Sequence, residues 1–170
     1  MKSHQTGFTL IEIIIVVVII SILAVFGVQM ISSGSVERNL QQHGRILQSS
    51  IQYSCDQATL QNIPYGVKFF QSGYAFSQFI NQQWIDLIAQ ETLISRELTD
   101  GSQLTLEIEG KVVVLQDDVG EVPHIICDNN GQITSFVLLF SDATETHHYQ
   151  LKTINFWQLE GQWLDDEKIN

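Results

Sequence analysis

The sequence predicts an α+β protein in which a long N-terminal hydrophobic helix packs on a β-rich globular head of antiparallel strands. Three observations lead to this fold class. Residues 8–28 form an almost continuous apolar run, helical periodicity continues beyond it, and after residue 61 the period becomes that of β-strands. A chain of 170 residues has room for one domain plus such an extension.

The apolar run over 8–28 follows a short polar segment, residues 1–7, and contains a single charged residue, Glu12. A helix needs about 20 apolar residues to cross a bilayer, so the run predicts a membrane helix. An ordinary secretory signal would instead show a shorter apolar core followed by a small-residue cleavage site.

Glu12 is the unusual residue of this run. An ionisable side chain inside a membrane segment costs a few kcal/mol and is usually tolerated with the help of a partner. Two interpretations stay open at this point: Glu12 is paired, or it lies near enough to the lipid headgroups to remain hydrated.

Residues 29–61 are expected to continue the helix as an amphipathic segment. Gly27 and the cluster Ser32–Ser35 suggest a break or a bend, because glycine costs about 1 kcal/mol in a helix interior. Beyond them one apolar face recurs at mostly three- and four-residue spacing: Val36, Leu40, Leu47, Ile51, Cys55 and Ala58. The predicted helix ends near Gln61, since Pro64 disfavours helical angles in the residue before it.

Residues 62–170 are predicted to form the head. The alternating segments give paired strands at VKFF and YAFSQFI, and at LTLEIE and VVVL with a turn at Gly110–Lys111. Asn130–Gly131 lies between apolar runs and predicts a hairpin, because both residues tolerate positive φ. Residues 147–163 predict a final strand or hairpin, 86–100 a connection, and 164–170 a frayed end.

The charge balance argues against nucleic acid as a partner. Eight Lys and Arg against nineteen Asp and Glu give a formal net charge of −11, which repels phosphate backbones. The basic residues after Gln61 are scattered and form no stripe. The sequence also lacks a nucleophile elbow, a phosphate-cradling loop and a catalytic triad in motif context, so neither an enzyme nor a cofactor is expected.

Metal sites are not expected either. His147 and His148 are adjacent, so on a strand they point to opposite faces. Asp117, Asp118 and Glu121 form an acidic loop that could offer oxygen ligands to calcium, but the ligand alternation of an EF-hand loop is missing. A solvated acidic turn is the better interpretation of the loop.

The two cysteines, Cys55 and Cys127, allow one disulfide. In an oxidising compartment a bridge between helix and sheet would stabilise the head. The alternative is a pair of buried thiols, since free cysteine packs as a small hydrophobe. The sequence does not give the Cα separation that decides between them.

The segment Gly7-Phe8-Thr9-Leu10-Ile11-Glu12 resembles the N-terminal signature of type IV prepilins and of the pseudopilins of type II secretion systems. The resemblance implies that a prepilin peptidase cuts between Gly7 and Phe8 and methylates the new amine of Phe8. It also implies that Glu12 meets the positively charged N-terminus of a neighbouring subunit during assembly.

Within this family the head resembles the H-type minor pseudopilins, through IPYGVKF, GYAF, Trp84 and the run PHIICDNNGQITSFVLLF. The expected partners are other major and minor pseudopilins, the peptidase and methyltransferase, the inner-membrane secretion platform and secreted proteins. The expected location is the bacterial inner membrane, crossed once, with the head in the periplasm and a place near the tip of the pseudopilus.

Two other functions stay open at this stage. A minor pilin of a type IV pilus would carry the same leader and helix, and a membrane anchor that never polymerises would share the apolar run. Glu12 discriminates the anchor, because an anchor does not need a carboxylate there.

Overall fold

The computed structural model describes residues 10–88, 92–98 and 101–164, with side chains in these ranges except at 24–35. The chain divides into two compact units, Met1–Glu37 and Arg38–Asn170. One helix, α1 (Leu10–Gln61), belongs to both units by sequence. The predicted frayed end falls almost wholly on residues 165–170, outside the described residues.

The helical assignment of α1 continues through Gly27 and Gly34. The break suggested by these residues does not occur in the described backbone. A helix that is already formed on both sides needs no new nucleation, and two glycines cost only about 1 kcal/mol each. The helix ends where predicted, at Gln61, and Asn62 follows with a φ of 56°.

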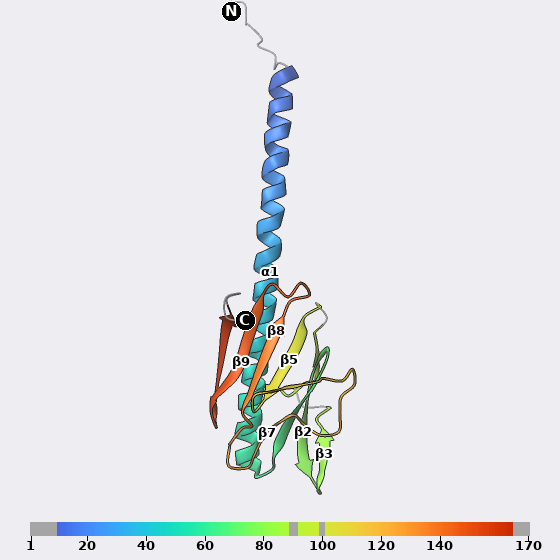
Figure 1. Ribbon diagram of the computed structural model, residues 1–170, viewed down its shortest axis with the longest axis vertical. Helices are drawn as coiled ribbons and strands as arrows, with labels where there is room; N and C mark the ends of the chain where they lie inside the picture. Colours follow the sequence, from blue (N-terminus) through green and yellow to red (C-terminus); the bar gives the residue numbers. More distant parts are fainter. Residues whose placement is uncertain (1–9, 89–91, 99–100, 165–170) are drawn as a thin grey trace, which may run out of the picture. The chain divides into compact units, whose positions relative to one another are not determined.

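The described residues of the head form ten strands in two antiparallel sheets. Figure 1 shows several of these strands beside α1. The first sheet has the order β3-β2-β1-β7, with β4 paired to β2. Its strands are β1 (Tyr65–Phe70), β2 (Gly73–Ile80), β3 (Gln83–Asp86), β4 (Arg96–Glu97) and β7 (Ile125–Cys127). The second sheet has the order β10-β9-β8-β5-β6. Its strands are β5 (Gln103–Ile108), β6 (Lys111–Val113), β8 (Phe136–Ser141), β9 (His148–Asn155) and β10 (Gln158–Leu164).

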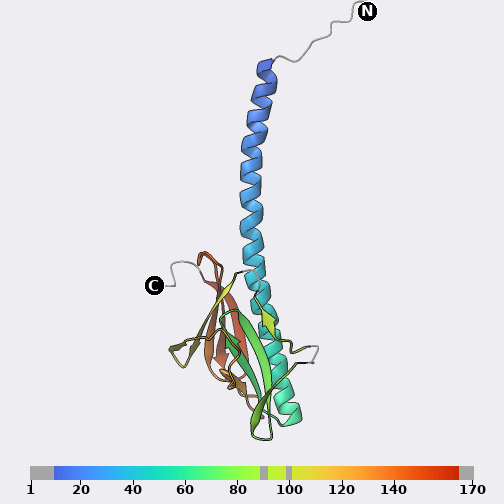
Figure 2. The ribbon, with the colours of Figure 1, turned by 90° about the vertical axis from the view of Figure 1, so that its right-hand side faces the viewer.

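Residues 38–61 of α1 lie along the strands of the head in both views (Figures 1 and 2). Five of the six residues predicted for the apolar face of this helix are buried, and Val36 is half-buried. The buried five are Leu40, Leu47, Ile51, Cys55 and Ala58. The predicted α+β fold, a helix packed on a β-rich antiparallel head, is therefore confirmed.

Gly44 lies between Leu40 and Leu47 on this face, and the ring of Tyr149 of β9 packs directly against its backbone. A Cβ built on Gly44 would overlap the Tyr149 ring, and a Cβ on Gly161 of β10 would overlap its hydroxyl. Tyr149 is only 3% exposed. Two glycines from different elements thus make room for one aromatic ring between α1 and the second sheet.

Replacing Gly44 with alanine is expected to destabilise the head. Alanine adds about 1 kcal/mol of helix propensity, but forcing a methyl group into a filled site costs about 1–3 kcal/mol. Urea unfolding of the full chain in detergent, followed by tryptophan fluorescence, measures the difference. Gln42→Ala on the exposed side of the helix should be close to neutral, and Tyr149→Leu should rescue Gly44→Ala. An equally stable Gly44→Ala variant would show that the ring is not confined.

Several local expectations need correction. The turn between β5 and β6 is Glu109–Gly110, with φ values of 51° and 77°, one residue earlier than predicted. Around Asn130–Gly131 the chain turns back for a single bridge, Cys127↔Ile133, and β8 then joins the second sheet. The segment 86–100, expected as a connection, contains the short strand β4. In each case tertiary pairing decided what the local pattern left open.

His124 extends the pairing of β1 with β7 through its side chain. Its backbone N–H donates to the Val67 carbonyl (2.9 Å), and its Nδ1 accepts a hydrogen bond from the Phe69 N–H (3.0 Å). Accepting this bond requires an unprotonated Nδ1. Burial also lowers the pKa of His124 from its ordinary value of 6.5.

Head stability is expected to fall as the pH falls from about 6.5 toward the lower folded-state pKa of His124. The stabilisation is complete above the unfolded-state pKa, and below it the unfolded chain binds the extra proton. Urea midpoints of the full chain at pH 7.5 and 5 measure this dependence. His124→Asn keeps an acceptor that does not titrate, so its midpoints should differ less between the two pH values. If His124→Asn showed the same pH dependence as the wild type, titration of His124 would not be its cause. His124→Phe should lose about 1–3 kcal/mol at every pH.

Candidate assembly site

The described side chains of the N-terminal unit form an apolar surface around the helix. From Leu10 to Leu23 the large hydrophobic side chains are roughly half exposed or more, with Leu10 at 79% and Val16 at 47%. A helix that is apolar on all sides normally has its surface covered by lipid or protein. Exposed apolar area of this extent marks an interaction surface.

Two polar side chains interrupt this surface. Ser21 donates its hydroxyl to the Val17 carbonyl (2.7 Å), so its polar group is satisfied within the helix. Glu12 lies exposed in the first turn of α1, where a negative charge complements the positive end of the helix dipole. A carboxylate in an apolar surface can pair with a cation, and the pairing gains electrostatic strength when water is excluded.

Gly7 and Phe8, the predicted cleavage and methylation positions, lie outside the described residues. Within the part of the chain that is described, no helix combines the length and the continuous apolar character needed to cross a membrane. The membrane span predicted over 8–28 stays a prediction.

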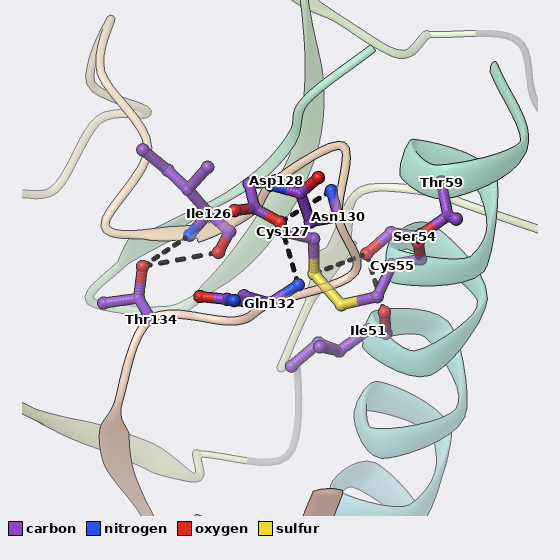
Figure 3. The surroundings of a disulfide bond; sticks show 10 residues. All are labelled: Ile51, Ser54, Cys55, Thr59, Ile126, Cys127, Asp128, Asn130, Gln132 and Thr134. Atoms are coloured by element: carbon purple, nitrogen blue, oxygen red, sulfur yellow. Dashed lines mark hydrogen bonds between the residues drawn. A yellow bond between two sulfur atoms is a disulfide. The ribbon is translucent and has the colours of Figure 1, made fainter. Parts of the chain in front are cut away.

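In the head, Cys55 of α1 and Cys127 of β7 form a disulfide, with a Cα–Cα distance of 5.0 Å (Figure 3). Ser54 lies beside the bridge, with its Oγ 3.8 Å from the Cys127 Sγ. The same hydroxyl donates to the Ile51 carbonyl (2.8 Å). The bridge links the helix directly to the edge strand of the first sheet.

The turn after Cys127 is fixed by its own hydrogen bonds (Figure 3). Asp128 accepts at Oδ1 from the backbone N–H groups of Asn130 (2.9 Å) and Gln132 (2.8 Å). Asn129 donates to Asn62, just past the end of α1 (2.9 Å). The disulfide and this amide pair together hold the end of the helix against the turn.

The remaining candidate ligands are not brought together. His148 is buried and bonds the Ser141 hydroxyl through Nδ1 (2.9 Å), whereas the His147 side chain is half-buried at the β8–β9 loop. Asp117, Asp118 and Glu121 are exposed. Among the described residues, no group of three histidine, cysteine or acidic side chains could hold a metal ion.

Sequence reasoning missed Asp142, which organises the β8–β9 loop. Its carboxylate accepts from the Thr146 and His147 N–H groups (2.8 Å each) and from the Thr144 hydroxyl. Burial alone would raise the pKa of Asp142, but these bonds outweigh burial and hold it well below its ordinary value. The D-x-T-x-T spacing is a turn signal that the sequence offered.

Two basic side chains of the head are paired with carboxylates. Lys68 is 3% exposed, and its Nζ lies 2.6 Å from Asp86 Oδ1. Lys152 Nζ lies 3.6 Å from Glu160 Oε2 on the neighbouring strand. These two lysines therefore add little positive potential to the surface.

Comparison with known proteins identifies the N-terminal segment first. Residues 2–28 match the family described as Prokaryotic N-terminal methylation motif. The chain is 29% identical to type II secretion system protein H of Pseudomonas aeruginosa over 148 residues, which cover 80% of this chain and 83% of that protein. It is 23% identical to the protein of the same name from Aeromonas hydrophila over 166 residues, covering 91% and 90%.

The fold agrees with solved structures. The minor pseudopilin EpsH of Vibrio cholerae matches with a TM-score of 0.62 at 14% identity, covering 74% of this chain and 97% of that one. Escherichia coli GspH matches with a TM-score of 0.62 at 19% identity, covering 78% and 94%. The chain is thus similar in sequence to type II secretion system protein H and shares the fold of the H-type minor pseudopilins. The likeness includes the head and so extends beyond the matched N-terminal residues 2–28.

Proposed function

We propose that this pseudopilin is a structural subunit of the periplasmic pseudopilus of a type II secretion system, placed near its tip, and that it supports export of folded proteins across the outer membrane. Its role is assembly rather than catalysis. Its partners are other major and minor pseudopilins and the inner-membrane secretion platform. The observation that carries the proposal is Glu12, the one charged side chain between Leu10 and Leu23 of a mostly apolar helix surface that follows the sequence Gly7-Phe8.

The proposed pathway starts with insertion of residues 8–28 into the inner membrane as a single span. The prepilin peptidase cuts after Gly7, which leaves Phe8 with a free amine that is then methylated. An amine at a chain terminus has a pKa near 8 and stays charged at neutral pH. In the filament, this cation of one subunit meets Glu12 of its neighbour, and the apolar helices pack together.

The proposal is tested by measuring protein export in cells that lack the gene. Complementation with the wild-type gene should restore export. In pseudopili sheared from these cells, the chain should also cross-link to other pseudopilins. Restored export without any cross-link to a pseudopilin would overturn the structural role. Normal export by the deletion strain would overturn the assignment to secretion.

A further inference from the structure

The second sheet of the head ends on one side at β6. Within the described ranges, β6 pairs with β5 and no strand is found on its outer edge. Figure 1 shows β9, β8 and β5 side by side in this sheet. Val112 and Val114 are 68% and 81% exposed at the edge. Exposed valines on an unpaired edge are a site at which another strand can add.

The turn geometry decides which backbone groups face outward. A two-residue turn with positive φ at both Glu109 and Gly110 makes Ile108 and Lys111 the hydrogen-bonded pair that closes the hairpin. The N–H and C=O groups of Lys111 and Val113 then face β5. Those of Val112 face away from it, and Val114 continues the same alternation.

Gln116 supports this alternation and limits the open edge. It lies four residues after Val112, so its backbone groups also face away from β5. Its carbonyl accepts a hydrogen bond from the Gln71 N–H (2.9 Å), and the β1–β2 turn therefore closes the edge there. Among the described residues, no backbone partner beyond β5 is found for Val112 or Val114. The free edge therefore covers only Lys111 to Val114.

A groove of about 450 Å³ lies beside this edge. Val112, Leu104 and Leu115 give it apolar walls, and Thr105, Gln71 and Gln103 give it polar ones. Such a groove can accept the alternating side chains of an extended segment, whose backbone would pair with Val112 and Val114.

The charge around the edge selects the occupant. Glu107 lies opposite Val112, Glu109 is in the turn, and Asp117 and Asp118 follow β6, against the single cation Lys111. Four carboxylates and one ammonium give a local formal charge of −3. A second copy of the same edge would bring like charges together, whereas a basic segment would be attracted.

We propose that the open edge of β6 binds, by β-strand addition, a short extended segment of a neighbouring pseudopilus subunit in which basic residues alternate with β-branched ones. The identity of the occupant rests on the proposed function. The short edge and Lys111 limit nonspecific pairing, so the contact involves about three to four residues of the partner strand.

A peptide probe tests strand addition on the full chain in detergent micelles. The probe is a blocked seven-residue peptide in which valine alternates with lysine, and the controls are its N-methylated form and a valine–glutamate peptide. At saturation, exchange of the Val112 and Val114 amides should slow at least tenfold with the probe and be unchanged with either control. No protection at these two amides would overturn strand addition.

Substitutions at Val112 separate backbone pairing from side-chain contact. Val112→Pro removes an N–H that does not pair with β5 and should weaken probe binding at least tenfold, whereas Val112→Thr keeps this N–H and should weaken it less than threefold. Both variants must show the wild-type urea midpoint. Equal affinities of the two variants would overturn the proposal.

The occupant is tested in cells with a photoreactive amino acid at position 114. The expected product joins this position to a basic extended segment of another pseudopilin, located by mass spectrometry. Cross-links only to other proteins would overturn the choice of occupant. Failure of the proposed function is measured separately, because Glu12→Ala changes assembly but leaves probe binding at the head intact.

Discussion

Glu12→Ala is expected to abolish incorporation of the chain into the pseudopilus, and secretion with it, while membrane insertion and leader cleavage continue. The substitution would leave the Phe8 amine of a neighbouring subunit without its partner in an apolar contact. Breaking a buried ion pair in this way costs about 3–5 kcal/mol, which is more than about a hundredfold in an equilibrium constant. Incorporation is measured as the amount of the chain in sheared pseudopili, detected with an antibody to the head.

Two variants serve as controls for the role of the charge. Glu12→Gln keeps the shape of the side chain and should fail like alanine, because the ionic partner is lost. Ser21→Ala changes another polar side chain of the same apolar surface, one already satisfied by the Val17 carbonyl, and should assemble normally. Full secretion by Glu12→Ala would mean that the chain acts as a membrane anchor that does not polymerise.

The second large effect is expected at the disulfide. Cys127→Ser opens a loop with a sequence separation of 72 residues. A constraint of this length on the unfolded chain is worth about 4 kcal/mol in the chain-entropy treatment. The urea midpoint of the full chain should fall to that of the wild type under dithiothreitol, and dithiothreitol should have no further effect on the variant.

Alkylation gives an independent measure of the same bond. The chain, purified without reductant and unfolded in urea, should gain no mass with iodoacetamide before reduction and two adducts after it. Two adducts on the unfolded chain before reduction would mean that Cys55 and Cys127 are buried thiols rather than a disulfide.

The helix and its apolar face were predictable because they follow from local spacing. Leu40, Leu47, Ile51 and Ala58 are buried as their periodicity indicated. The single long helix predicted to about Gln61 is confirmed from Leu10 onward. Gly27 suggested a break or a bend, but a local cost alone does not decide whether an established helix continues. The role of Gly44 could not be predicted, because its neighbour Tyr149 lies 105 positions further along the chain.

Strand positions were more predictable than strand partners. The pattern of Phe136, Leu138 and Phe140 indicated a strand, and all three are buried. It did not indicate that this strand would leave β7 and pair with β5 and β9. Both alternatives bury the same side chains, so hydrophobic pattern does not separate them.

The candidate assembly site rests on the motif over residues 7–12, which carries both the cleavage position and the charge, and its roles stay a prediction. The disulfide was not predictable, since two cysteines fix a possible pair but not its distance. The acceptor edge at β6 depends on which strand ends the sheet and on the Glu109–Gly110 turn, which the sequence placed one residue too late.

The central claim is that the chain is a processed, assembling pseudopilin. The most direct measurement is the mass and the N-terminal residue of the protein purified from its native membrane, with the prepilin peptidase present and deleted. The account predicts peptidase-dependent loss of residues 1–7 and a methylated Phe8 at the new N-terminus. A chain that begins at Met1 in both strains would contradict it.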